Sequence, residues 1–111
     1  MTNKYNVSPV ESGGIVYDSK AEEKRHKELL LMEKARAISA LHYHGITFHL
    51  GRSDKNRPIT YRPDFTYIED GRLVVEEVKG MRVRDFPVRM ALFKEKFPEW
   101  RLIVTGKGGS G

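Results

Sequence analysis

The sequence contains no cysteine, and this absence excludes disulfide bonds, thiolate nucleophiles and cysteine-ligated zinc. It also lacks any apolar run approaching the roughly 20 residues that a membrane-spanning helix needs. Residues 1–16 are polar and do not contain the apolar segment of a secretory signal peptide. We therefore expect an intracellular protein that has no membrane partner.

The composition suits one small folded domain with a polyanionic partner. A chain of 111 residues that is 39% hydrophobic and 32% charged can bury a modest core and is not disordered by composition. The 20 Lys and Arg residues outnumber the 15 Asp and Glu residues and give a net charge of +5. This excess is consistent with nucleic-acid binding, although many basic proteins of this size bind no nucleic acid. We expect residues 1–12 to form an extended arm, residues 13–105 a single domain and residues 106–111 a disordered glycine-rich tail.

The apolar pattern predicts two helices and four strands. Ser19 followed by Glu22 fits the capping-box signal that starts a helix, and the segment after it has no Gly or Pro. The expected elements are a helix from Ser19 to about Ala40, strands over Leu41–Leu50, Ile59–Ile68 and Leu73–Lys79, a helix from Asp85 to about Phe97, and a strand over Trp100–Thr105. This α-β-β-β-α-β order predicts an α/β fold with a central mixed sheet flanked by helices.

Asp70-Gly71 between two of the predicted strands is a strong signal for a two-residue hairpin turn, because a type I′ turn needs positive φ at both positions. Counting outward from this turn places Asp64 opposite Glu77, with Cβ atoms about 5 Å apart on one face of the sheet. Lys79 lies two residues along the same strand and therefore on that same face. The sequence thus predicts two carboxylates and a lysine gathered at one place.

Opposed carboxylates repel each other unless a cation lies between them. Lys79 alone can serve as that cation, and so can a divalent metal; oxygen ligands without cysteine suit Mg²⁺ or Mn²⁺. A metal at this place can polarise a phosphodiester and lower the pKa of a bound water. Two alternatives stay open: a structural ion-pair ladder on a solvated face, and a three-residue turn over residues 69–71 that pairs Asp64 with Glu76.

Pro63-Asp64 followed by Glu77-Val78-Lys79, in this order of elements, resembles the PD-(D/E)xK nuclease superfamily. Three segments, residues 14–22, 61–65 and 75–80, are similar to a family of small phage proteins regarded as endonucleases of the Holliday-junction-resolvase type. The resemblance implies a restriction-endonuclease-like core, a DNA partner and hydrolysis of phosphodiester bonds with Mg²⁺ or Mn²⁺. It also implies a location in the cytoplasm of a bacterium or of a phage-infected cell.

The resemblance assigns roles to the residues of the hairpin. Asp64 and Glu77 would bind the metal with help from the backbone carbonyl of Val78, and Lys79 would act on the nucleophilic water. Glu22 occupies the place of a fourth active-site residue, an acidic side chain supplied by the first helix.

Glu22 has a second interpretation. As the third helical residue after Ser19, it can bond back to the N–H of the cap, which is worth about 1 kcal/mol. Glu23 is then a substitute candidate for the active site. The chain departs from its relatives at Glu23, where they have Ala, at His26, where they have an aromatic residue, and at residues 42–44, where a Gln-Pro pair is missing. These departures affect local packing and substrate fit more than the catalytic residues.

Basic residues gather in the sequence on both sides of the hairpin. We expect them to bind phosphates near the carboxylates and to give DNA binding a steep salt dependence, although charged runs are more often solvated surface. The candidates are Lys20, Arg52, Lys55, Arg57, Arg62, Arg82 and Arg84.

A metal site formed by imidazoles is a weaker hypothesis. His42 and His44 share one face of a predicted strand and could chelate a metal with His26 or His49. Histidine pairs alone are poor evidence for a metal, because exposed histidines are common in basic proteins.

The aromatic residues offer base-stacking candidates. Tyr61 or Phe86 can be proposed to stack on a base, with core packing as the alternative for Phe86. Phe93 and Trp100 are expected in the core.

The sequence therefore predicts a metal-dependent DNA endonuclease acting on branched DNA, as a homodimer if two strands are cut symmetrically. One alternative is a catalytically inactive nucleic-acid-binding module of the same fold, and Asp64, Glu77 and Lys79 argue against it because all three are present. The other is a nuclease that nicks DNA or cuts linear DNA as restriction enzymes do. The branched substrate rests on resemblance alone.

Overall fold

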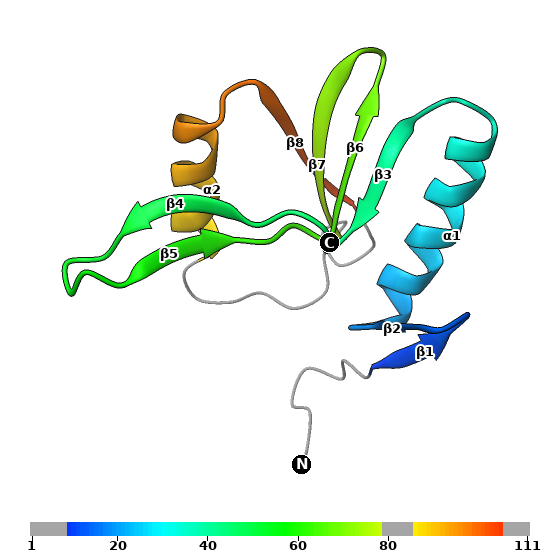
Figure 1. The fold of residues 1–111 in the computed structure, drawn as a ribbon, viewed down its shortest axis with the longest axis horizontal. Helices are drawn as coiled ribbons and strands as arrows, with labels where there is room; N and C mark the ends of the chain where they lie inside the picture. Colours follow the sequence, from blue (N-terminus) through cyan, green and yellow to red (C-terminus); the bar gives the residue numbers. More distant parts are fainter. Residues whose placement is uncertain (1–8, 79–85, 106–111) are drawn as a thin grey trace.

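A four-stranded mixed sheet forms the centre of the fold in the computed structural model, which describes residues 9–78 and 86–105 (Figure 1). Its strands are β3 (Ser39–Tyr43), β6 (Phe65–Glu69), β7 (Arg72–Val78) and β8 (Trp100–Thr105), in the spatial order β3-β6-β7-β8. The β3–β6 and β6–β7 pairs are antiparallel, and the β7–β8 pair is parallel. The carboxyl ends of β3, β7 and β8 therefore lie at the same end of the sheet as the amino end of β6.

One helix covers each face of this sheet (Figure 1). α1 (Lys20–Lys34) precedes β3, and α2 (Phe86–Lys96) lies in the crossover connection that the parallel strands β7 and β8 require. Because side chains alternate along a strand, β7 buries Val74 and Val78 in the cluster under α1 and Val75 in the cluster under α2. The predicted α-β-β-β-α-β order is confirmed for α1, β3, β6, β7, α2 and β8.

Two apolar clusters fill the spaces between the helices and the sheet. On the α1 side the buried members are Leu29, Ile38, Phe65, Tyr67, Val74 and Val78. On the α2 side they are Phe48, Leu50, Tyr61, Val75, Met90 and Phe93, with Phe86 and Trp100 packed against them. The expected core positions of Phe93 and Trp100 are confirmed, and Phe86 takes its core alternative.

Two short hairpins extend the fold beyond the predicted elements. β1 (Val10–Ser12) pairs with β2 (Ile15–Tyr17), so the last three residues of the expected extended arm form one strand of a hairpin, and residues 1–8 lie outside the described residues. β4 (Phe48–Arg52) pairs with β5 (Pro58–Tyr61) to form a hairpin that projects from the body of the protein past α2 (Figure 1).

The predicted strands over residues 41–50 and 59–68 are each wrong as single strands. His44 has a φ of 55° and leaves the extended conformation, so the first segment divides into β3 and β4. Pro63 has no N–H to donate to a ladder, and residues 62–64 separate β5 from β6. The β4–β5 hairpin is therefore an insertion between two neighbouring strands of the main sheet.

α1 ends at Lys34 rather than near Ala40, where the prediction placed its end. Arg36 follows the cap with a φ of 66°, and its N–H donates to the carbonyl of Glu33 at 3.0 Å. The next N–H along the chain donates to the carbonyl of Met32 at 2.8 Å. These two bonds make a Schellman motif in which arginine occupies the position where glycine is most common.

A buried ion pair fastens α1 to the sheet. Glu76 of β7 is fully buried, and Arg25 of α1 donates to both of its carboxylate oxygens, from Nε at 2.6 Å and from Nη2 at 3.2 Å. Tyr67 of β6 and Thr105 of β8 donate hydroxyl hydrogen bonds to the same carboxylate at 2.7 and 2.6 Å. One carboxylate therefore joins a helix to three strands.

Candidate functional site

The β6–β7 hairpin has the register that the sequence predicts. Asp70 and Gly71 have φ values of 53° and 76°, and the ladder that begins beside them ends with Phe65 opposite Glu76. The two-residue turn is therefore confirmed, and the alternative three-residue turn is excluded. Asp64 directly precedes the last paired residue of β6 and lies at the end of the sheet.

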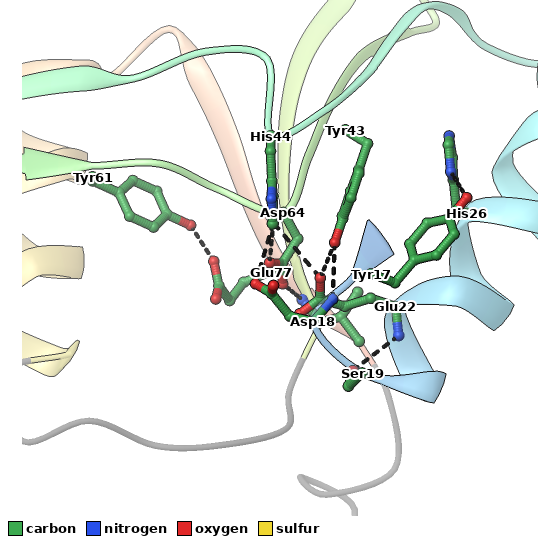
Figure 2. A network of polar contacts seen from close by, with 11 residues as sticks. Tyr17, Asp18, Ser19, Glu22, His26, Tyr43, His44, Tyr61, Asp64 and Glu77 are labelled. Atoms are coloured by element: carbon green, nitrogen blue, oxygen red, sulfur yellow. Dashed lines mark hydrogen bonds and ion pairs between the residues drawn. The ribbon is translucent and has the colours of Figure 1, made fainter. Parts of the chain in front are cut away.

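Backbone hydrogen bonds from both neighbouring strands hold Asp64 in place. Its Oδ2 accepts a hydrogen bond from the N–H of Val78 at 2.7 Å, and its carbonyl oxygen accepts one from the N–H of His44 at 3.0 Å. The side chain is almost fully buried. These bonds bring the ends of β3, β6 and β7 together, so that His44, Asp64 and Glu77 lie at one end of the sheet (Figure 2).

Glu22 reaches the same place from α1. Ser19 caps the helix by accepting a hydrogen bond from the N–H of Glu22 at 3.2 Å, so the cap uses the backbone of Glu22. The Glu22 carboxylate lies in the site instead, where Oε1 accepts a hydrogen bond from the hydroxyl of Tyr43 at 2.7 Å (Figure 2). The side chain of Glu23 forms an ion pair with Lys27 at 3.2 Å. Glu22 is therefore the helix glutamate that joins the other carboxylates.

Burial and like charge raise the pKa of the two glutamates. The pKa of Glu22 and that of Glu77 are each raised to about 7, first by burial and next by the negative charge of Asp64. Glu77 accepts a hydrogen bond from the hydroxyl of Tyr61 at 2.7 Å, and Glu22 accepts its bond from Tyr43. Both hydrogen bonds lower the glutamate pKa values without cancelling the rise. The carboxylates are therefore held together against their own repulsion.

His44 directs its Nε2 toward three carboxylates (Figure 2). That atom lies 3.4 Å from Asp64 Oδ1, 3.6 Å from Glu22 Oε1 and 3.9 Å from Asp18 Oδ2. The hydrogen bond with Asp64 raises the pKa of His44, while burial opposes the rise. In the part of the chain that the structure describes, Asp18, Glu22 and His44 form a group whose potential ligand atoms all lie within 4.8 Å of one another.

This set of donors fits a divalent cation. Carboxylate oxygens are hard ligands that suit Mg²⁺ and Mn²⁺, and an imidazole nitrogen is a ligand that suits transition metals. A bound cation would also relieve the repulsion that raises the pKa of Glu22 and of Glu77. The residues that could hold it are Asp18, Glu22, His44, Asp64 and Glu77.

The basic residues of the β4–β5 hairpin do not lie where the sequence analysis expected them. Arg52 is the last residue of β4, and Lys55 and Arg57 are exposed in the turn that follows. The hairpin carries this turn away from the end of the sheet where the carboxylates meet (Figure 1). The expectation that these three residues lie beside the carboxylates is therefore wrong.

Two other predicted phosphate-binding residues are described. Lys20 is the exposed first residue of α1, and Arg62 is exposed in the segment that leads to Asp64. The remaining predicted residues of the site lie outside the described residues; they are Lys79, Arg82 and Arg84.

The histidine hypothesis is wrong for three of its four residues. His26 Nδ1 is 2.6 Å from the hydroxyl of Tyr17 in a buried contact, and His42 and His49 are exposed. Among the described residues, His44 is the histidine that joins the acidic group.

The base-stacking hypothesis is wrong for Tyr61. Its side chain is 6% exposed, and its hydroxyl is bonded to Glu77. Neither Asp18 nor Tyr43 was among the predicted site residues. Asp18 precedes the N-cap Ser19 and lies outside α1, so no helical spacing indicates its position beside Glu22.

Comparison with known proteins identifies one family. A family model described as a protein of unknown function, DUF1064, matches residues 2–108. No curated protein and no solved structure matches the chain. Neither of the two described helices is long and apolar enough to cross a membrane.

Proposed function

The chain belongs to the DUF1064 family of proteins of unknown function, and we propose that it is a metal-dependent DNA endonuclease with a restriction-endonuclease-like core. The observation that carries the proposal is the meeting of Glu22, Asp64 and Glu77 at one end of the sheet (Figure 2). Burying carboxylates together costs stability unless a cation binds among them. Groups with strongly raised pKa values in such an arrangement are typical of functional sites.

In this proposal the carboxylates hold a Mg²⁺ or Mn²⁺ ion. Asp64 and Glu77 are its main ligands, and Glu22 and the backbone carbonyl of Val78 add to them. The ion, when bound, polarises the phosphodiester and lowers the pKa of a water. Lys79, which the resemblance assigns to the attacking water, lies outside the described residues, so its role rests on the sequence.

Two tyrosines, Tyr61, which is buried, and Tyr43, which is partly buried, position the glutamates of the site. Tyr61 donates to Glu77 and Tyr43 donates to Glu22, both at 2.7 Å. Each hydrogen bond fixes the orientation of one carboxylate before any substrate binds, which is the arrangement that catalysis by prepositioned groups needs. We assign both tyrosines to positioning.

The substrate we propose is branched DNA, as for the phage proteins that the sequence resembles. Symmetric cutting of two strands at a junction requires two active sites, so we propose a homodimer. A DNA substrate of this kind would place the enzyme in the cytoplasm of a bacterium or of a phage-infected cell.

The experiment that tests the activity is a cleavage assay on labelled four-way junctions, linear duplexes and single strands. Each substrate is incubated with Mg²⁺, with Mn²⁺ or with EDTA. The proteins compared are the wild type, Asp64→Ala, Glu77→Ala and Lys79→Ala, with Glu99→Ala as a matched control that removes an exposed acidic residue far along the chain from the site. We expect metal-dependent cutting by the wild type and the control, and losses of about a hundredfold or more in the three site variants.

The other outcomes separate the alternatives. Junction binding without cleavage under any metal would replace the endonuclease by a nucleic-acid-binding module. Cutting of linear DNA in preference to junctions would indicate a nicking or restriction-like nuclease. Cutting that survives all three site variants would place the activity elsewhere or in a contaminant.

A further inference from the structure

The position of His44 is fixed by its neighbours before any metal binds. Its N–H donates to the carbonyl of Asp64, and its ring stacks on the ring of Tyr43 with centroids 3.9 Å apart and an angle of 21° between the planes. Its φ of 55° is uncommon for a residue other than glycine, although histidine is one of the residues that adopt it more often. The imidazole is therefore held with its Nε2 facing the carboxylates (Figure 2).

The distances around Nε2 are those of ligands rather than of tight ion pairs. Charge-assisted N–H···O hydrogen bonds are about 2.7–2.9 Å long. The three contacts of His44 Nε2 with Asp64, Glu22 and Asp18 are 3.4, 3.6 and 3.9 Å. Donors that share one ion through bonds of about 2.1 Å lie roughly 3–4 Å from one another. The contact with Asp64 is a long hydrogen bond, and the potential ligand atoms of Asp18, Glu22 and His44 all lie within 4.8 Å of one another, so that one ion can reach several of these side chains at once.

We propose that His44 is a further direct ligand of the metal that Asp64, Glu77 and Glu22 hold, with Asp18 beside it, and that this mixed imidazole–carboxylate site prefers Mn²⁺ and other transition metals to Mg²⁺. Mg²⁺ favours oxygen ligands and keeps much of its water, whereas imidazole nitrogen is a good ligand for transition metals. This proposal adds the class of metal to the proposed function. It depends on that function only for the statement that the bound metal serves DNA cleavage. The exposed carboxylate of Asp18 supplies an additional oxygen at the open side of the site.

A different role for His44 makes the opposite prediction. If His44 acts as an imidazolium that neutralises the carboxylates, it competes with a divalent cation for the same position. Removing it would then strengthen the binding of Mn²⁺ and of Mg²⁺. If His44 is a ligand, removing it weakens the binding of Mn²⁺ and changes the binding of Mg²⁺ little.

The test measures metal binding on the full chain without DNA. Mn²⁺ binding is followed by the loss of the electron paramagnetic resonance signal of free Mn²⁺, and Mg²⁺ binding by its competition with Mn²⁺. The variant is His44→Asn, because asparagine tolerates positive φ and lacks the imidazole. The matched control is His49→Asn, which removes an exposed histidine of β4. Thermal unfolding of both variants checks that they fold.

We expect His44→Asn to weaken Mn²⁺ binding by about tenfold or more and to lower the ratio of Mn²⁺ to Mg²⁺ affinity, with His49→Asn unchanged. An unchanged ratio, or tighter binding of both metals, overturns the proposal. In the wild type, Mn²⁺ should broaden the ring resonances of His44 before those of His49, and equal broadening would also overturn it. The metal-binding test uses no DNA and is therefore independent of the cleavage assay. If Mn²⁺ binding depends on His44 but the protein cuts no DNA, this inference is supported and the proposed endonuclease activity is contradicted.

Discussion

The acidity of the site is set by residues within a few ångströms of one another. Glu22 and Glu77 accept hydrogen bonds from Tyr43 and Tyr61, which favour the charged forms, yet both pKa values are raised to about 7. Burial and the charge of Asp64 therefore outweigh the hydrogen bonds. The same three carboxylates that make a cation favourable also make the metal-free protein sensitive to pH.

The sign of this sensitivity follows from linkage. The folded pKa of about 7 lies above the ordinary value of 4.5 for Glu22 and for Glu77, so between these values the folded state binds more protons than the unfolded state. The free energy of unfolding of the metal-free protein should therefore fall as the pH rises from about 5 to 8, by on the order of 2 kcal/mol. The raised pKa of His44 acts in the same direction.

Urea unfolding in the presence of EDTA, repeated from pH 5 to pH 8, measures the predicted fall in the free energy of unfolding. The double variant Glu22→Gln/Glu77→Gln should have a flatter profile, since neither amide titrates. In the wild type, saturating Mn²⁺ should restore stability most strongly near pH 8, where the carboxyl groups have lost their protons. A metal-free protein that gains stability as the pH rises through this window would contradict the assignment of the raised pKa values.

At the scale of elements, the candidate site requires α1 and β7 to keep a fixed position relative to each other. α1 carries Glu22 and β7 carries Glu77. The Arg25–Glu76 ion pair joins the same two elements, because Arg25 follows Glu22 by three residues in α1 and Glu76 directly precedes Glu77 in β7. The carboxylate of Glu76 is fully buried, and removing Arg25 would leave its charge without the guanidinium that compensates it. This ion pair therefore holds the helix in the position that brings Glu22 to the carboxylates of the candidate site.

Replacing Arg25 with alanine should destabilise the protein by about 3 kcal/mol, because breaking a buried ion pair leaves an uncompensated charge. Urea unfolding measures the loss, and Lys24→Ala, which removes an exposed positive charge from the neighbouring position, is the control. The loss of stability in Arg25→Lys should lie between the losses in Arg25→Ala and Lys24→Ala, since lysine keeps the positive charge but cannot form the bidentate hydrogen bond. Equal effects of Arg25→Ala and Lys24→Ala would show that the charge of the helix surface, and not the ion pair, matters.

The elements that the sequence predicted well are those with a local chemical signal. Asp70-Gly71 specified a two-residue turn, and that turn fixed the register that leads to Asp64 and Glu77. The end of α1 had no such signal, because arginine stands at position 36 where glycine would have marked it. The division between β5 and β6 had such a signal in Pro63, whose missing N–H interrupts a ladder, but the prediction of one strand over residues 59–68 did not use it.

The candidate site was predictable only where it follows from strand register or from resemblance. Glu22 came from the resemblance. The alternative in which its side chain bonds back to the cap is wrong, because the cap uses only the backbone N–H of Glu22 while the carboxylate bonds to Tyr43 in the site. His44, Tyr43 and Tyr61 reach the carboxylates through tertiary packing between strands distant in sequence. No spacing rule along the chain predicts such contacts.

On the scale of the whole molecule, the positive charge is spread over more than one surface. The net charge of +5 attracts a polyanion, but the exposed cations Lys55 and Arg57 lie at the turn of the projecting β4–β5 hairpin and not beside the carboxylates (Figure 1). The base of that hairpin is anchored in the α2-side core through Phe48, whose ring packs against Phe93 and Trp100. A hairpin anchored in this way can bind phosphates at a distance from the proposed site of cleavage.

Substituting both hairpin cations, Lys55→Gln with Arg57→Gln, should therefore weaken DNA binding and reduce the slope of log K against log salt by up to about 2, because each lost phosphate contact removes about 0.9. Arg52 is left in place because it donates to the carbonyl of Asn56 and supports the turn. Fluorescence anisotropy at several salt concentrations, with labelled junctions and duplexes, gives both the affinity and the slope.

The control for that prediction changes the net charge by the same amount elsewhere. Lys94→Gln with Lys96→Gln removes two exposed cations from the last turn of α2. If the hairpin binds phosphates, its variant loses more affinity than the α2 variant and keeps the metal affinity of the wild type. If the hairpin variant and the α2 variant weaken DNA binding equally, DNA binding depends only on the overall charge of the protein, and the hairpin makes no phosphate contact of its own.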